Sequence, residues 1–98
     1  MGYITLMIVN FKHRGLEQFF ESGSTRGIQT NQAKRIRLIL ARLSAANSPQ
    51  DMNLPGLMLH ELAGQRQGTW AVRVSGNWRI TFTFDGVDAR DVNLEDYH

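Results

Sequence analysis

The stretch WAVRVSGNWRITFTF, residues 70–84, decides the fold. On both sides of Ser75-Gly76-Asn77, apolar and polar side chains alternate, which is the period-two pattern of strands with one buried face. The stretch therefore predicts a β-hairpin with strands over residues 70–74 and 78–84.

The apolar faces of the two strands set the register of this hairpin, because a one-residue slip would bury the wrong side chains. A two-residue Gly76-Asn77 turn would place Val74 opposite Arg79. A three-residue turn over residues 75–77 places Val74 opposite Trp78 and brings the apolar faces together. We therefore predict the three-residue turn.

The same register predicts that Arg73 and Arg79 face each other on the opposite side of the hairpin. Two cations in this position repel unless an anion or a carboxylate lies between them. Two interpretations stay open: the side chains are solvated or paired with Asp or Glu, or they clamp RNA phosphate or an acidic partner segment.

Outside the hairpin, the spacing of apolar residues predicts the remaining elements. Helical spacing predicts a short helix around residues 16–20, ended by Gly23, and a longer helix over about residues 31–46. Strands are predicted at residues 8–11, at 57–62 and, after the Asp85-Gly86 turn, at about 89–94; a loop is predicted at residues 64–68.

Length and composition limit the class of protein. A chain of 98 residues with 42% hydrophobic residues predicts one folded domain over residues 1–98. The absence of cysteine excludes disulfides and thiolate metal sites and favours the cytoplasm. Residues 1–9 are too short to span a membrane and have no export signal, so we expect no membrane partner. The net charge of +2 and the excess of Arg favour a polyanion only weakly.

The chain ends in Glu95-Asp96-Tyr97-His98, which gathers groups that transfer protons. RNA cleavage by attack of a 2'-hydroxyl needs a base, an acid for the leaving oxygen, and a cation for the charged phosphorane. His60, His98 and Arg79 would supply these without a metal or another cofactor. The simpler alternatives are an ordinary strand histidine at His60, a frayed tail and a packed Tyr97; a metal site from His60, His98 and Asp96 has no paired-ligand pattern to support it.

The order of short motifs carries a resemblance to a known family. The motifs are Leu59-His60-Glu61-Leu62-Ala63-Gly64, Gly68-Thr69-Trp70, Val72-Arg73-Val74, Asn77-Trp78-Arg79-Ile80-Thr81-Phe82 and Asp96-Tyr97-His98. In this order they resemble the HigB toxins of the RelE/ParE superfamily over residues 8–98. Residues 1–6 precede the matching part and are interpreted as a non-essential extension.

The resemblance implies a compact α/β fold of the α+β kind, with two helices packed on a mainly antiparallel four-stranded sheet. It implies a ribosome-dependent messenger RNA endoribonuclease, an mRNA interferase that inhibits translation and arrests growth. The implied partners are a HigA-type helix-turn-helix antitoxin of a type II toxin–antitoxin system, the 70S ribosome and mRNA. Operator DNA would be contacted only through the antitoxin.

The resemblance also assigns roles to individual residues. It makes His60 and His98 acid and base groups, Arg79 the phosphate-stabilising cation, and Asp96 and Tyr97 supporting groups. The predicted RNA-binding residues are Arg37, Arg42, Arg66 and Arg73. One departure is Ala63, where relatives commonly have lysine; either Arg66 or Arg73 substitutes for that cation, or the enzyme is slower or depends more on Arg79.

Two other functions remain open from the sequence. A ParE-like toxin shares the superfamily fold and poisons DNA gyrase, which would leave His60 and the Asp96-Tyr97-His98 terminus without a role. A non-catalytic module would bind RNA or a protein through the surface of Arg37, Arg42, Arg73 and Arg79.

Overall fold

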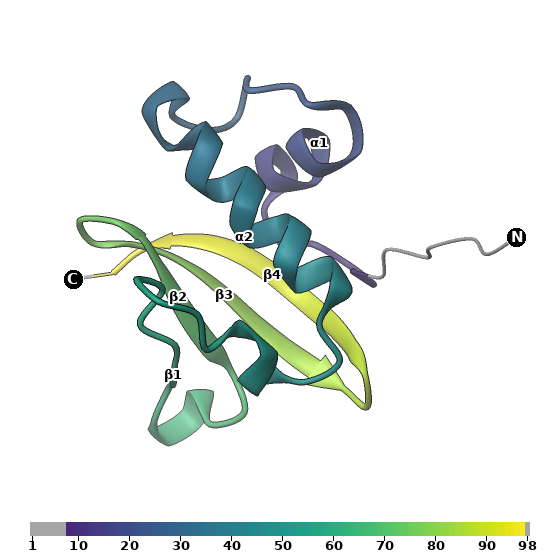
Figure 1. The fold of residues 1–98 in the computed structure, drawn as a ribbon, viewed down its shortest axis with the longest axis vertical. Helices are drawn as coiled ribbons and strands as arrows, with labels where there is room; N and C mark the ends of the chain where they lie inside the picture. The colour runs from purple at the N-terminus through teal and green to yellow at the C-terminus, as the bar shows by residue number, and fades with distance from the viewer. Residues whose placement is uncertain (1–7, 98) are drawn as a thin grey trace, which may run out of the picture.

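The computed structural model describes residues 8–97 as two layers, one of helices and one of strands (Figure 1). The main helices are α1 (Arg14–Ser22) and α2 (Ala33–Ala45), and the sheet contains β1 (His60–Glu61), β2 (Trp70–Ser75), β3 (Trp78–Asp85) and β4 (Asp88–Asp96). The strands lie in the order β1-β2-β3-β4, and all neighbours are antiparallel. The predicted fold class is confirmed.

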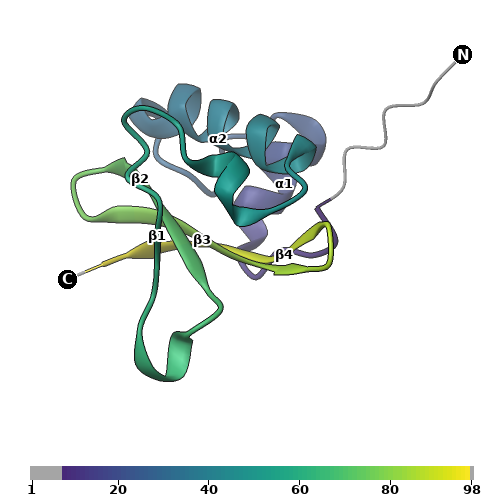
Figure 2. The same cartoon turned by 60° about the horizontal axis from the view of Figure 1, so that its bottom comes forward.

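Both helices cover the same face of the sheet, and the connection from β1 to β2 extends below the other face (Figure 2). The connections between these elements contain short 3-10 helices: η1 (Thr30–Gln32), η2 (Pro49–Met52) and η3 (Gly64–Arg66). None of the helices in the described part of the chain is long and apolar enough to cross a membrane.

Local signals explain the bounds of α1. The Nδ1 atom of His13 accepts a hydrogen bond of 3.1 Å from the amide of Leu16, so this side chain satisfies a free N–H of the first turn. Burial lowers the pKa of His13, which favours the neutral ring that this cap requires. At the other end, Gly23 adopts a left-handed conformation (φ 79°), and its N–H donates a hydrogen bond to the carbonyl oxygen of Phe19. This conformation ends the helix.

The core lies between the two layers. Apolar side chains from α1 and α2 pack against those that β2, β3 and β4 direct to the same side. The largest completely buried side chains are Phe82, Leu16, Ile36, Ile39, Leu40, Leu43, Met52, Ile80, Val72 and Val92. Because one face of the sheet is fully used for this core, polar side chains gather on the opposite face.

The hairpin turn differs from the prediction. Arg73 pairs with Arg79 as predicted, but Trp78 pairs with Ser75, so the turn contains only Gly76 and Asn77. The prediction of a three-residue turn was wrong because a β-bulge adds one residue to β2 at Val74. The bulge reconciles a tight turn with the apolar pattern, since Val74 remains 2% exposed.

Three predicted strands have different lengths in the structure. The strand predicted at residues 57–62 is limited to His60–Glu61, and the last strand is longer than predicted and continues to Asp96. Residues 8–11 form two isolated parallel bridges to β4 rather than a regular strand, through Ile8 and Phe11. The N-terminal segment thus lies along the outer edge of β4.

A pair of reciprocal hydrogen bonds holds this segment to β4. The amide of the Asn10 side chain donates to the Asp91 carboxylate at 2.9 Å, and the Asp91 backbone N–H donates to Asn10 Oδ1 at 3.0 Å. Asp91 has a φ of 53°, at a second β-bulge that adds a residue to β4 opposite β3. The hydrogen bond from Asn10 is the main reason that the pKa of Asp91 is lowered.

We expect Asn10→Ala to destabilise the protein by about 1–2 kcal/mol, because two partly buried polar groups of Asp91 lose their partner. Urea unfolding at pH 7 measures the change. The matched control is Asn47→Ala, which removes an exposed side chain and should alter the free energy of unfolding by less than about 0.5 kcal/mol. Equal unfolding midpoints for the two variants would show that the hydrogen bonds between Asn10 and Asp91 do not stabilise the fold.

Candidate active site

The face of the sheet that the helices leave open carries most of the predicted site residues. Direct pairing places His60, Ala71, Thr81 and Asn93 in one row across the four strands. A second row, two residues further along the strands, contains Arg73, Arg79 and Glu95. Residues two apart in a strand point to the same side, so both rows belong to one surface. We call this surface the open face.

His60 lies on the edge strand of the open face and is exposed. Its Nδ1 atom lies 3.2 Å from the carbonyl oxygen of Met58. That contact is a hydrogen bond if Nδ1 carries the proton, which leaves Nε2 as the free acceptor. A neutral ring in this tautomer has the form that a general base needs.

Arg73 and Arg79 face each other on the open face, as the sequence predicted. The Arg79 guanidinium donates to the carbonyl oxygens of Gly76 and Trp78 at 2.9 and 3.2 Å, so the hairpin turn orients it. The Arg73 guanidinium contacts the sulfur of Met58 at 3.9 Å. Within residues 8–97, neither side chain forms an ion pair with a carboxylate. The two adjacent positive charges therefore suit a phosphate anion.

Arg66 behaves differently from these two arginines because it already has an anionic partner. Its guanidinium holds the Glu95 carboxylate in a bidentate pair, with N–O distances of 2.9 and 2.7 Å. Arg66 comes from η3, in the β1–β2 connection, and Glu95 lies on β4 at the far side of the sheet. The ion pair thus bridges the open face from one edge to the other.

Glu95 is the most strongly perturbed acid in the described part of the chain. Hydrogen bonds from Arg66 lower its pKa to about 2, against the opposing effect of burial. The hydroxyl of Thr81 also donates to it at 2.6 Å, and the Asn93 amide donates at 3.5 Å. These donors keep a carboxylate ionised on β4, at one side of the open face.

From the sequence, Glu95 was counted among the proton-transfer groups of the C-terminus, but it was not predicted as a site residue and no partner was predicted for it. A signal was present, because Glu95, Asn93 and Thr81 all occupy outward positions of strands whose inward positions are apolar. Without the β3–β4 register and the path of η3, the sequence did not show which cation would reach this carboxylate.

The structure describes two of the three predicted C-terminal site residues, Asp96 and Tyr97. The backbone N–H of Tyr97 donates to the carbonyl of Asn77 at 2.7 Å, which holds the residue beside the hairpin turn. Tyr97 is 51% exposed, and its hydroxyl lies close enough to Arg66 to affect that group electrostatically. Asp96 pairs with Trp78, and strand alternation directs it to the other side of the sheet from Glu95. His98 lies outside the described residues.

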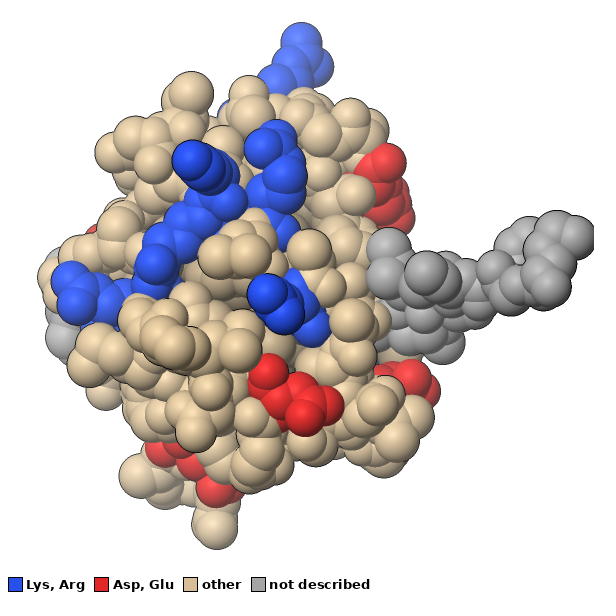
Figure 3. Space-filling view, viewed as in Figure 1, with Lys and Arg blue, Asp and Glu red and all other residues tan. Residues whose placement is uncertain are grey.

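The predicted RNA-binding residues do not all lie together. Arg66 and Arg73 lie on the open face, but Arg37 and Arg42 are exposed on α2, in the other layer. Figure 3 looks onto the helix layer and shows Lys and Arg side chains gathered across it. The protein therefore has two separate basic surfaces, and only one of them includes His60 and Arg79.

The open face carries an imidazole and cations, which are two of the three kinds of group that phosphodiester cleavage needs. It combines the exposed imidazole of His60 with two arginines that form no ion pair with a carboxylate within residues 8–97, all on strands of one sheet, and the phenol of Tyr97 follows directly after β4. Side chains on strands hold their positions more precisely than those on loops. Among the described residues, no three His, Cys, Asp or Glu side chains are grouped so that they would hold a metal ion.

The Glu95 environment predicts a pH-dependent contribution to stability. Because the folded-state pKa is depressed, this contribution is present above the ordinary pKa of 4.5 and is lost as the pH falls toward about 2. We therefore expect Glu95→Gln to lower the free energy of unfolding at pH 7, with a difference from the unsubstituted protein that shrinks between about pH 5 and pH 2.

Urea unfolding at several pH values measures this difference. The control is Asp85→Asn, which removes a 74% exposed carboxylate paired with Arg90 at 3.1 Å. Such a surface pair contributes only about 0–1 kcal/mol, so the control should show a small effect at every pH. A Glu95→Gln difference that stays constant from pH 7 to pH 2 would show that the ion pair does not stabilise the fold.

Comparison with known proteins identifies the family of this chain. Residues 9–98 match the family described as the RelE-like toxin of the type II toxin–antitoxin system HigB. The chain is also similar to Endoribonuclease HigB of Proteus vulgaris, with 42% identity over 92 residues, which covers 94% of this chain and 100% of that protein. The resemblance found in the sequence is confirmed. This chain belongs to the HigB family of RelE-like toxins of type II toxin–antitoxin systems.

Proposed function

We infer that this chain is an endoribonuclease, as its relative from Proteus vulgaris is named, and we propose that its substrate is mRNA on the ribosome. The observation that supports this most directly is the open face, where His60 shares one surface with Arg73, Arg79 and Tyr97. Cleavage in coding sequences would inhibit translation and arrest growth.

The proposed reaction is metal-independent attack of a ribose 2'-hydroxyl on the adjacent phosphorus. One imidazole, of His60 or His98, removes the hydroxyl proton while the new O2'–P bond forms. The P–O5' bond breaks, and the other imidazole protonates the leaving oxygen. Both electrons of the broken bond go to that oxygen, so no oxidant, reductant or other cofactor is needed.

The arginines of the open face would stabilise the charge that develops on the phosphoryl oxygens. Arg79 is the main candidate because the turn carbonyls fix its guanidinium before substrate binds. Arg73 lies directly opposite and is our candidate to replace the lysine that relatives carry where this chain has Ala63. Arg66 is less available, since a phosphate would have to compete with Glu95 for it.

Tyr97 and Asp96 have supporting roles in this proposal. The exposed ring of Tyr97 can stack on a base, an interaction that protein aromatic groups commonly offer to single-stranded RNA. Asp96 directly precedes Tyr97 and His98, and its proposed role is to orient the terminal imidazole.

The partner of a type II toxin is an antitoxin, and we propose a HigA-type helix-turn-helix protein. Operator DNA would then be bound through that antitoxin rather than by this chain. The 70S ribosome is the proposed site of action, and the cytoplasm is the compartment where toxin, mRNA and ribosome meet.

We expect expression of this chain alone to arrest growth, with mRNA cut inside open reading frames, and co-expression of the antitoxin to restore growth. Primer extension on ribosome-bound transcripts maps the cuts. Intact transcripts together with gyrase-linked DNA breaks would support a ParE-like poison instead. Intact transcripts and intact DNA would support the non-catalytic binding module.

We expect deletion of His98 to abolish cleavage and His60→Gln to reduce its rate by about 10²–10⁴-fold, because each removes a proton-transfer group. Both variants should keep the fold and the affinity for antitoxin. The matched control is His13→Asn, which preserves a hydrogen-bond acceptor at the start of α1 and should cleave normally. Full cleavage after deletion of His98 would exclude this residue from the mechanism.

A further inference from the structure

The middle of the open face is covered, although α1 and α2 lie on the other side of the sheet. Ala71 and Thr81 belong to the two central strands of this face, yet they are only 1% and 4% exposed. Leu62, the first residue after β1, is 9% exposed. All three lie outside the core between the layers. A second, smaller group of buried side chains therefore lies on the side where the connection from β1 to β2 extends (Figure 2).

The β1–β2 connection, residues 62–69, contains two glycines in left-handed conformations. Gly64 has a φ of 68° and Gly68 a φ of 94°. Glycine loses more conformational freedom on folding than other residues, so this segment needs contacts with the rest of the protein to keep one conformation. The N–H of Gly68 donates to the Glu61 carboxylate at 2.9 Å, which joins the end of the connection to β1. That bond does not reach the central strands.

The ion pair of Arg66 and Glu95 joins the middle of the connection to β4. The side chains are 47% and 22% exposed, and an exposed ion pair contributes little unless it is bidentate or part of a network. This pair meets both conditions, because it is bidentate and the Thr81 hydroxyl donates to the same carboxylate at 2.6 Å. Since Thr81 is one of the buried side chains, the ion pair lies directly beside them.

The position of His60 depends on this connection because β1 is short and lies at the edge of the sheet. The strand has two residues, His60 and Glu61, and it pairs with β2. The connection begins directly after Glu61, so its movement away from the sheet would displace β1 and the imidazole. A misplacement of about 1 Å can lower the rate of a catalysed reaction about 100-fold.

An alternative is that Arg66 binds RNA phosphate and that Glu95 withholds it until the substrate arrives. The contacts favour a permanent link, because a phosphate would have to replace a bidentate carboxylate that Thr81 also holds. Opening the pair would also expose the apolar side chains of Leu62 and Ala71, which opposes release. The two alternatives predict opposite effects on cleavage when Glu95 is neutralised.

We propose that Arg66 and Glu95 are positioning residues, whose ion pair holds the β1–β2 connection against the sheet and so keeps His60 in place for cleavage. The inference rests on the proposed function and adds two residues that act through His60 rather than on the RNA. It gives Arg66 a different role from the RNA binding predicted from the sequence.

The kinetic test measures single-turnover cleavage of ribosome-bound mRNA by the full chain. We expect Glu95→Gln and Arg66→Met each to lower the rate at saturating toxin about 10–100-fold, with unchanged affinity for the ribosome. The double variant should be no slower than the slower single variant, because both changes break the same link. The control is Arg90→Met, which removes the arginine of another ion pair, 3.1 Å from Asp85, and should cleave normally.

The direction of these effects decides between the alternatives. Faster cleavage by Glu95→Gln, or a loss confined to Arg66→Met, would show that Arg66 acts on the RNA and would overturn the proposal. Asn10→Ala controls for a general loss of stability, because it weakens contacts at the other edge of the sheet and should cleave at the normal rate.

Hydrogen exchange tests the link without measuring activity. The N–H of Leu62 donates to the carbonyl of Thr69 at 2.8 Å, across the two ends of the connection. In Glu95→Gln and Arg66→Met we expect this N–H to exchange at least about tenfold faster. The N–H of Lys12, which donates to Val92 at 2.8 Å at the other edge, is the control and should not change. Equal acceleration at both sites would indicate general destabilisation and would overturn the proposal.

A crosslink tests whether restraint alone restores cleavage. The chain contains no cysteine, so the double variant Arg66→Cys, Glu95→Cys offers two specific sites for a short bis-maleimide. We expect the linked form to cleave at least about tenfold faster than the unlinked form, because the link replaces the ion pair without its charges. Equal rates would overturn the proposal. If the unsubstituted chain leaves mRNA intact, the proposed function fails; if it cleaves and Glu95→Gln cleaves equally fast, only this inference fails.

Discussion

The β-bulge at Val74 is the constraint on which the rest of the structure depends. The hairpin has a tight two-residue turn. Without an extra residue in β2, that turn would place Val74 opposite Arg79 in the strand pairing. With the bulge, Val74 stays in the core, and Arg73 and Arg79 face each other on the other side. One local irregularity thus separates an apolar face that holds the helices from a polar face that is free for chemistry.

The open face is organised by how its charges are paired. Glu95 holds Arg66 and accepts further hydrogen bonds from the sheet, so one cation is neutralised and the β1–β2 connection is tied to β4. Arg73 and Arg79 form no such ion pair within residues 8–97, and the turn carbonyls orient Arg79. The sheet therefore keeps two adjacent positive charges available to a phosphate beside an exposed imidazole.

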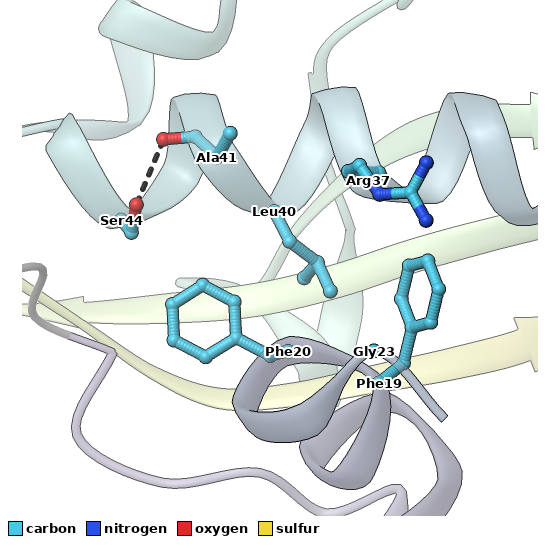
Figure 4. A pocket seen from close by; sticks show the side chains of 7 residues that line it. All are labelled: Phe19, Phe20, Gly23, Arg37, Leu40, Ala41 and Ser44. Atoms are coloured by element: carbon cyan, nitrogen blue, oxygen red, sulfur yellow. Dashed lines mark hydrogen bonds between the residues drawn. The ribbon is translucent and has the colours of Figure 1, made fainter. Parts of the chain in front are cut away.

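The two layers present different surfaces. The sheet presents the candidate nuclease site, and the helix layer presents an apolar groove between α1, which contains Glu17 and Glu21, and α2, which contains no acidic residue (Figure 4). Both surfaces rest on the same core, which side chains of α1, α2 and the sheet form together. Substitutions at exposed positions such as Ala41 allow one surface to be changed without removing side chains that hold the layers together.

The sequence by itself determined the helices, the central hairpin, the pairing of Arg73 with Arg79 and the family, because side-chain periodicity and motif order are local properties of the chain. It did not determine the turn, since a bulge satisfies the same apolar pattern with a different residue count. Only the tertiary structure decided that Arg66 forms an ion pair with Glu95 and that Arg37 and Arg42 lie away from His60. Those relations depend on how η3 crosses the sheet and on which face the helices cover, and both result from long-range packing that local patterns do not encode.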